Sequence, residues 1–129
     1  MQTYNKKRIL VVDDDYMLIA SLIRIFQHLK SKYFLDIAMD GSEALGRVLN
    51  FHPHLIILDL KLPGINGFEI CETIKAQPET LDSKILAITG YDIPANRRKI
   101  LASGADDYLP KPFELNKLLE KIDRLLEEE

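Results

Sequence analysis

The sequence predicts an α/β fold, a doubly wound five-stranded parallel sheet with five helices distributed over both of its faces. Short aliphatic runs alternate along the chain with longer stretches of helical period, which is the pattern of repeated strand–helix units. Right-handed crossovers between parallel strands place the connecting helices on both faces. The chain has 129 residues, of which 47% are hydrophobic, and this suits a single domain.

Five segments are predicted to be strands. Continuous apolar quartets, expected where a strand is buried on both faces, occupy residues 9–12, 55–58 and 85–88. Residues 33–39 include a charged side chain and are typical of an edge strand. Residues 106–109 provide the fifth strand.

The segments between the strands carry helix signals. Apolar residues recur at helical spacing after the first strand and near the carboxyl end, at Leu18, Leu22, Ile25, Phe26 and Leu29, and at Leu115, Leu118, Leu119, Ile122, Leu125 and Leu126. Three further helices are expected within residues 41–49, 67–75 and 94–104. Pro94 and Gly104 bound the last of these, because proline is tolerated in a first turn and glycine is favoured at a helix end.

Composition and charge exclude several classes of partner and location. The net charge of −3 gives no electrostatic reason to expect nucleic acid or a membrane as a direct partner. The single cysteine, Cys71, cannot form an internal disulfide, which favours a reducing compartment. The opening residues MQTYNKKR are polar, and the next apolar run is too short for a secretory signal or a membrane span. We therefore expect a cytoplasmic location.

Polar side chains stand directly after four of the predicted strands. Asp13 and Asp14 follow the first strand, Asp59 the third, Thr89 the fourth and Lys111 the fifth. Ligands of open parallel sheets bind outside the carboxyl ends of the strands, so we expect these five side chains to converge at one edge.

Three neighbouring carboxylates require a cation or a raised pKa. Two like charges ~4 Å apart repel by roughly 4 kcal/mol at a surface-like dielectric. Since the candidate ligands are all oxygens, a hard ion fits best, and Mg²⁺ commonly shares its coordination shell with a phosphate. Asp59 is the candidate nucleophile because it lies on the central strand, away from the Asp13–Asp14 pair, and carboxylates form acyl phosphates. Asp15 stands where the first helix begins and is expected as its N-cap or first-turn acid.

The four motifs at the strand ends resemble a known family. ILVVDDD, LIILDLKLPGINGFE, ILAITG and GADDYLPKPF, in this order and spacing, resemble the receiver domain of two-component response regulators. Each motif alone is modest, but the ordered set is specific. The resemblance implies a flavodoxin-like sheet with strand order 2-1-3-4-5, and a single receiver domain over residues 1–129 with its core at about 7–126.

The resemblance also implies a signalling role, not that of a metabolic enzyme. Asp59 would accept a phosphoryl group from a phosphohistidine on a sensor histidine kinase or a His-containing phosphotransfer protein. Mg²⁺ would be held by Asp13, Asp14, Asp59 and the backbone carbonyl of Lys61. Lys111 would contact the phosphoryl group.

A coupled movement of two residues would transmit the signal. Thr89 would move to bind the phosphoryl group, and Tyr108 would swing into the vacated space. This shift would re-form the face built from the fourth helix, the fifth strand and the fifth helix. The family also implies that the Lys111–Pro112 peptide bond is cis.

The same face is the expected surface for a downstream protein or for a phosphorylation-dependent homodimer. In such a dimer Asp106 and Asp107 would meet basic residues such as Arg97 or Lys121 across a two-fold axis.

Other interpretations of these residues were weighed. Singly, the acids could be solvated helix-opening or turn residues, Thr89 a strand-end hydroxyl and Lys111 a surface lysine, but their joint occurrence at four strand ends argues against this. A haloacid-dehalogenase-like phosphohydrolase would require a second acid two residues after Asp59, where Lys61 stands. A flavodoxin-like cofactor protein would require a Ser/Thr-rich loop after the first strand, where three aspartates stand. A pseudo-receiver, an unphosphorylated protein-binding module on the same fold, stays open as the alternative.

Overall fold

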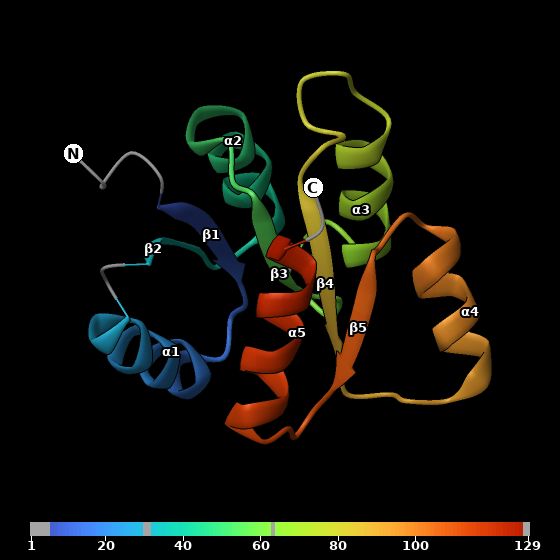
Figure 1. The fold of residues 1–129 in the computed structure, drawn as a ribbon. Coiled ribbons are helices and arrows are strands. Elements are labelled where there is room, and N and C mark those ends of the chain that lie inside the picture. The colour runs from blue at the N-terminus through green and yellow to red at the C-terminus, as the bar shows by residue number, and fades with distance from the viewer. Residues whose placement is uncertain (1–5, 30–31, 63, 128–129) are drawn as a thin grey trace.

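Strands and helices alternate along the whole described chain. In the computed structural model the described residues are 6–29, 32–62 and 64–127. They form ten elements in strict alternation (Figure 1), namely β1 (Lys7–Val12), α1 (Tyr16–His28), β2 (Tyr33–Ala38), α2 (Gly41–Phe51), β3 (Leu55–Asp59), α3 (Gly67–Lys75), β4 (Lys84–Thr89), α4 (Pro94–Ala102), β5 (Asp107–Pro110) and α5 (Leu115–Glu127).

The strands form one parallel sheet in the order β2-β1-β3-β4-β5. Its register pairs Val12 with Leu58 between β1 and β3, and Asp59 with Ile88 between β3 and β4. The predicted doubly wound order is therefore confirmed, and β2 is an edge strand as its sequence indicates. Because all strands run the same way, the carboxyl ends of β1, β3, β4 and β5 open at one edge of the sheet (Figure 1).

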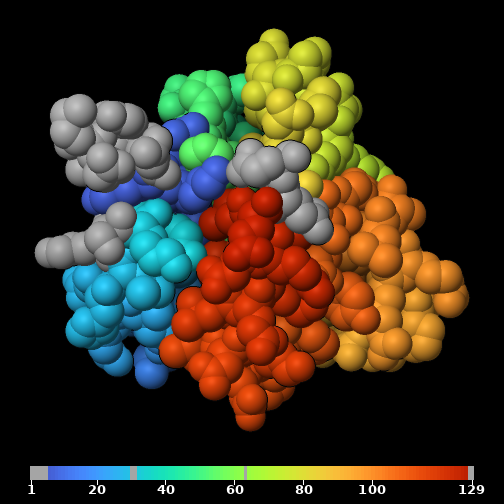
Figure 2. Space-filling view, viewed as in Figure 1, coloured from blue at the N-terminus to red at the C-terminus, as the bar shows by residue number. Residues whose placement is uncertain are grey.

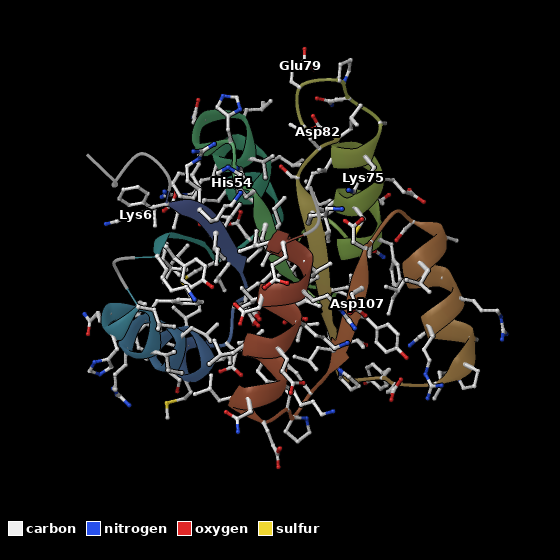
Figure 3. All side chains as sticks on the ribbon, viewed as in Figure 1. Lys6, His54, Lys75, Glu79, Asp82 and Asp107 are labelled. Atoms are coloured by element: carbon white, nitrogen blue, oxygen red, sulfur yellow. The ribbon has the colours of Figure 1, made fainter. Side chains whose placement is uncertain are left out.

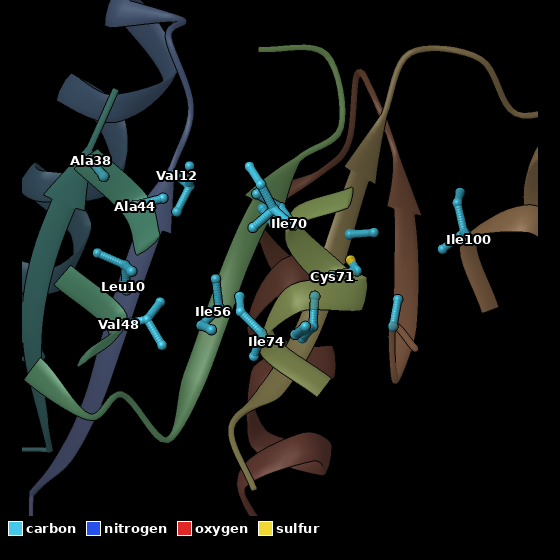
Figure 4. Packing of buried hydrophobic residues seen from close by; sticks show 14 residues of the cluster. Leu10, Val12, Ala38, Ala44, Val48, Ile56, Ile70, Cys71, Ile74 and Ile100 are labelled. Carbon is cyan, nitrogen blue, oxygen red and sulfur yellow. The ribbon is translucent and has the colours of Figure 1, made fainter. Parts of the chain in front are cut away.

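Two apolar clusters fill the space between the sheet and its helices. Residues of α1 and α5 pack against one face of the sheet, and these two helices cover it in the space-filling view (Figure 2). Residues of α2, α3 and α4 pack against the other face (Figure 4). Cys71 lies fully buried in this second cluster, as a small apolar residue would. The continuous apolar runs in β1, β3 and β4 thus reflect burial on both faces.

Two predicted helix ends have different outcomes in the structure. Asp15 caps α1 by accepting from the backbone N–H groups of Met17 and Leu18, which confirms its expected role. Gly104 adopts a φ of +108°, a conformation that favours glycine, but α4 ends two residues earlier because Ser103 is its C-cap.

One glycine brings two segments of the chain into close contact beside the third strand end. A Cβ added to Gly67 would lie 2.5 Å from the Cα of Leu60, the residue that follows β3. Glycine at the first position of α3 therefore lets the helix approach the backbone next to Asp59. No helix in the described ranges is both long and apolar enough to cross a membrane.

Candidate functional site

The carboxyl edge of the sheet holds a cleft of about 860 Å³. Four of the predicted site residues, Asp14, Asp59, Thr89 and Lys111, line it, and each comes from the end of a different strand. Asp13 is only 1% exposed and forms an ion pair with Lys111, which lines the cleft. The structure therefore brings together all five side chains that the strand-end rule selects.

Three carboxylates form a compact acidic cluster. One carboxylate oxygen from each of Asp13, Asp14 and Asp59 lies within 4.8 Å of the other two. Asp13 and Asp59 are buried and Asp14 is exposed. The backbone N–H of Asp15 donates to Oδ1 of Asp13 at 2.9 Å, and that of Lys61 donates to Oδ1 of Asp59 at 3.0 Å. These bonds fix the orientation of the two buried carboxylates.

Lys111 supplies the positive charge that faces this cluster. Its Nζ lies 3.1 Å from Oδ2 of Asp13 and 3.3 Å from Oδ2 of Asp59, so one ammonium bridges both buried acids. Partial burial alone would lower the pKa of Lys111, but the hydrogen bonds and charges of Asp13 and Asp59 outweigh burial and raise it. The lysine is therefore held in its charged form at neutral pH.

The environment of Asp13 opposes its ionisation. Burial, and then the nearby charge of Asp59, raise the pKa of Asp13 from its ordinary 3.8 to about 6, despite the hydrogen bonds from Asp15 and Lys111. A cation bound between the acids would offset the energetic cost of ionising Asp13. All three side chains offer oxygen, the donor that Mg²⁺ prefers, so the residues present fit that ion.

The two predicted switch residues lie in different surroundings. Thr89 is 5% exposed, and its Oγ1 accepts a hydrogen bond of 3.0 Å from the backbone N–H of Tyr91. Tyr108 is partly exposed and lines a separate depression of about 480 Å³ together with Asp107 and Lys121. The structure thus places Thr89 in the cleft wall and Tyr108 outside that wall.

The charges expected to meet across a dimer axis are paired within the chain. Oδ2 of Asp107 accepts from Lys121 at 3.0 Å and from Arg124 at 2.5 Å. Figure 3 shows Asp107 on β5 beside α5. Asp106 pairs with Lys75, and the remaining basic residue, Arg97, pairs with Asp92.

Two of the other residues that line the cleft come from helices. Phe68 comes from the first turn of α3 and Asn96 from the first turn of α4. The strand-end rule cannot find them, because they reach the cleft through the packing of helices. The Lys111–Pro112 peptide bond is cis, as the resemblance implies.

Comparisons with known proteins agree with this fold. A family model described as the response regulator receiver domain matches residues 9–123. The response regulator MprA of Mycobacterium sp. (strain KMS) is 40% identical over 119 residues, which cover 92% of this chain and 50% of that protein. The chain thus spans about half the length of the curated relatives it matches.

Solved structures resemble the chain over almost its whole length. A CheY-like response regulator receiver domain protein from Methanospirillum hungatei JF-1 has a TM-score of 0.85 and 35% identity, with 95% of both chains covered. A second similar structure is the receiver domain of the sensor histidine kinase PA1611 from Pseudomonas aeruginosa PAO1, with a TM-score of 0.84 and 25% identity over 95% of this chain and 98% of that chain. That structure is described with a magnesium ion coordinated in its active site cleft.

The match to the family model over most of the chain, the sequence relatives and the structural neighbours all lead to one family. The chain belongs to the receiver domains of two-component response regulators, which are signalling proteins and not metabolic enzymes.

Proposed function

We propose that this receiver domain is switched by phosphorylation of Asp59, with a histidine kinase or a His-containing phosphotransfer protein as the donor. The observation that carries the proposal is the bridge from Lys111 to Asp13 and Asp59, at 3.1 and 3.3 Å, in a cleft at the strand ends. An ammonium, a buried carboxylate and a cluster of oxygen ligands together match the needs of phosphoryl transfer.

In the proposed reaction a carboxylate oxygen of Asp59 attacks the phosphorus of the phosphohistidine. A P–O bond forms, the P–N bond breaks, and its electron pair returns to the imidazole of the donor. The hydrogen bond from the Lys61 backbone N–H holds the Asp59 carboxylate in place during this step. The Lys111 ammonium lies where it can meet the charge of the phosphoryl oxygens.

Mg²⁺ is the proposed cofactor of the transfer. Asp13, Asp14 and Asp59 would hold it, together with the backbone carbonyl of Lys61, which lines the same cleft. When bound, the ion would neutralise charge on the phosphoryl oxygens. The oxygen-only donor set supports this choice, and so does the magnesium described for the PA1611 receiver domain.

Thr89 and Tyr108 are the proposed relay to the output face. Thr89 lies in the cleft wall, and Tyr108 lies on β5, packed against the apolar cluster to which α4 contributes Ile100. Rearrangement of the two would alter the face formed by α4, β5 and α5, where we place the downstream partner or a second copy of the chain. A homodimer through this face would have to share or exchange the bonds that Asp107 makes to Lys121 and Arg124.

Phosphorylation by a small donor tests the proposal. Incubation with acetyl phosphate and Mg²⁺ is expected to add one phosphoryl group to the protein, as measured by intact mass. The product should be labile to base and should not form when EDTA removes the metal. Asp59→Asn should abolish it, whereas Asp82→Asn, in the exposed α3–β4 connection, should not. If the wild-type protein stays unmodified even with a competent histidine kinase, the pseudo-receiver interpretation replaces this one.

A further inference from the structure

Helix α4 is held to the molecule by few side chains. Of its nine residues, all of them described, only Ile100 is buried. Ile93 stands at the N-cap and makes no side-chain capping bond. Lys99 lies with its Nζ 4.3 Å from the centre of the Phe68 ring, which lines the cleft. A helix attached in this way depends on a small number of contacts for its position.

A chain of hydrogen bonds connects the first turn of α4 to the cleft wall. The Nδ2 of Asn96 donates to the backbone carbonyl of Tyr91 at 3.0 Å. The backbone N–H of Tyr91 donates to Oγ1 of Thr89 at 3.0 Å, and that hydroxyl lies 3.4 Å from the same Tyr91 carbonyl. The backbone of Tyr91 therefore engages the Thr89 hydroxyl as both donor and acceptor.

The hydrogen bonds between Thr89 and the backbone of Tyr91 compete with the proposed binding of a phosphoryl group by Thr89. A hydroxyl has one proton to donate, so Thr89 cannot donate to a phosphoryl oxygen while that proton points at Tyr91. The bond from Asn96 stabilises the Tyr91 peptide group in the position that engages Thr89. The Asn96 bond therefore stabilises the conformation in which the Thr89 hydroxyl points at Tyr91, relative to the conformation in which that hydroxyl points at a bound phosphoryl group.

We propose that Asn96 is a positioning residue that restrains Thr89 through Tyr91 and so lowers the affinity of the cleft for a phosphoryl group. The inference rests on the proposed function, since it requires that Thr89 binds that group. A ligand that binds only the released state has its apparent affinity reduced by the fraction of molecules in that state. Loss of one neutral hydrogen bond corresponds to roughly a threefold to tenfold change in this fraction.

The affinity for beryllofluoride in the presence of Mg²⁺ tests the inference. Calorimetric titration should give a dissociation constant about threefold to tenfold lower for Asn96→Ala and for Asn96→Leu, which nearly keeps the size of the side chain. Asn96→Gln keeps an amide donor and should stay closer to the wild-type value. Arg98→Ala, at an exposed position on the same helix, should match the wild type. Structural damage alone would weaken binding, so a gain in affinity distinguishes positioning from a merely structural role.

A second readout uses the protein without metal or beryllofluoride. The amide signal of Tyr91 in ¹H–¹⁵N spectra should shift, and its hydrogen exchange should quicken, in Asn96→Ala but not in Arg98→Ala. If the wild type binds beryllofluoride but neither Asn96→Ala nor Asn96→Leu binds it more tightly than the wild type, the inference about Asn96 is wrong. The proposed function would not be affected by that result. Absence of beryllofluoride binding by the wild type would overturn the proposed function, and the inference with it.

Discussion

Nζ of Lys111, directly after β5, lies 3.3 Å from Oδ2 of Asp59 at the end of β3, although 52 positions separate the two residues in the sequence. The same ammonium lies 3.1 Å from Oδ2 of Asp13 after β1. One lysine thus joins the ends of three strands, and its position follows from the parallel sheet that aligns them. The consequences of this contact, and of the acids it bridges, can be measured.

Lys111→Met should slow phosphorylation of the domain. The change removes the ammonium that faces Asp59, and with it the charge proposed to stabilise the transferring phosphoryl group. The rate of modification by acetyl phosphate with Mg²⁺ is expected to fall at least about tenfold. Lys117→Met, at an exposed position on α5, is the matched control and should react at the wild-type rate. Equal rates for the two variants would remove Lys111 from the mechanism.

Asp13→Asn should stabilise the metal-free protein and weaken its response to Mg²⁺. The folded-state pKa of Asp13 is about 6, above its ordinary 3.8, so the folded protein binds this proton more tightly than the unfolded chain. Stability therefore falls as pH rises from about 4 to about 6, and the charged carboxylate is unfavourable at pH 7.5.

Asparagine resembles the uncharged form of this side chain. In EDTA at pH 7.5, urea denaturation should show a free energy of unfolding about 1–2 kcal/mol higher for Asp13→Asn than for the wild type. Added Mg²⁺ should stabilise the wild type more than the variant, because the variant lacks one proposed ligand. A variant less stable than the wild type in EDTA would contradict the assigned electrostatics.

Two glycine substitutions should have effects of opposite sign. Gly67→Ala would place a Cβ 2.5 Å from the backbone of Leu60, so the segment after Asp59 would have to shift, at a cost of about 1–3 kcal/mol. Gly46→Ala meets nothing within 4 Å inside α2 and should stabilise the protein by about 0.5–1 kcal/mol. Urea denaturation of both variants measures the difference, and similar values would show that the contact with Leu60 is unimportant.

The ion pairs of Asp107 should produce a pH-dependent contribution to stability. Burial raises the pKa of Asp107, but hydrogen bonds from Lys121 and from the Tyr108 backbone outweigh burial and hold the pKa below its ordinary value of 3.8. The contribution is therefore present at neutral pH and is lost as pH falls through the lowered pKa. Asp107→Asn should cost about 0.5–1 kcal/mol at pH 7 and progressively less below pH 3.8. Glu120→Gln, exposed on the same helix as Lys121, should show no such trend.

The sheet and the strand-end residues could be predicted from the sequence for a physical reason. Strands buried on both faces have continuous apolar sequences, so the end of each strand can be located to within a residue or two. Parallel alignment then brings Asp13, Asp59, Thr89 and Lys111 to one edge, as the structure shows. That Asp59 accepts phosphate and that the acids bind Mg²⁺ stay predictions.

Other features depend on tertiary packing that no local pattern encodes. Asn96 and Phe68 reach the cleft only because α4 and α3 pack beside it. The carboxylate of Asp107 pairs with Lys121 and Arg124 of the same chain because α5 lies against β5. From the sequence alone, its basic partner could also have come from a second subunit. The position of Tyr108 outside the cleft wall likewise depends on how β5 packs against the apolar cluster formed with α2, α3 and α4.

Chemical trapping of the acyl phosphate is the most direct test of the central claim, that Asp59 is the phosphoacceptor. Borohydride reduces an aspartyl phosphate to homoserine, which peptide mass spectrometry can locate. After reaction with acetyl phosphate and Mg²⁺, the account predicts homoserine at position 59 and at no other aspartate. Homoserine at position 13 or 14, or no trapped product from a fully folded protein, would contradict it.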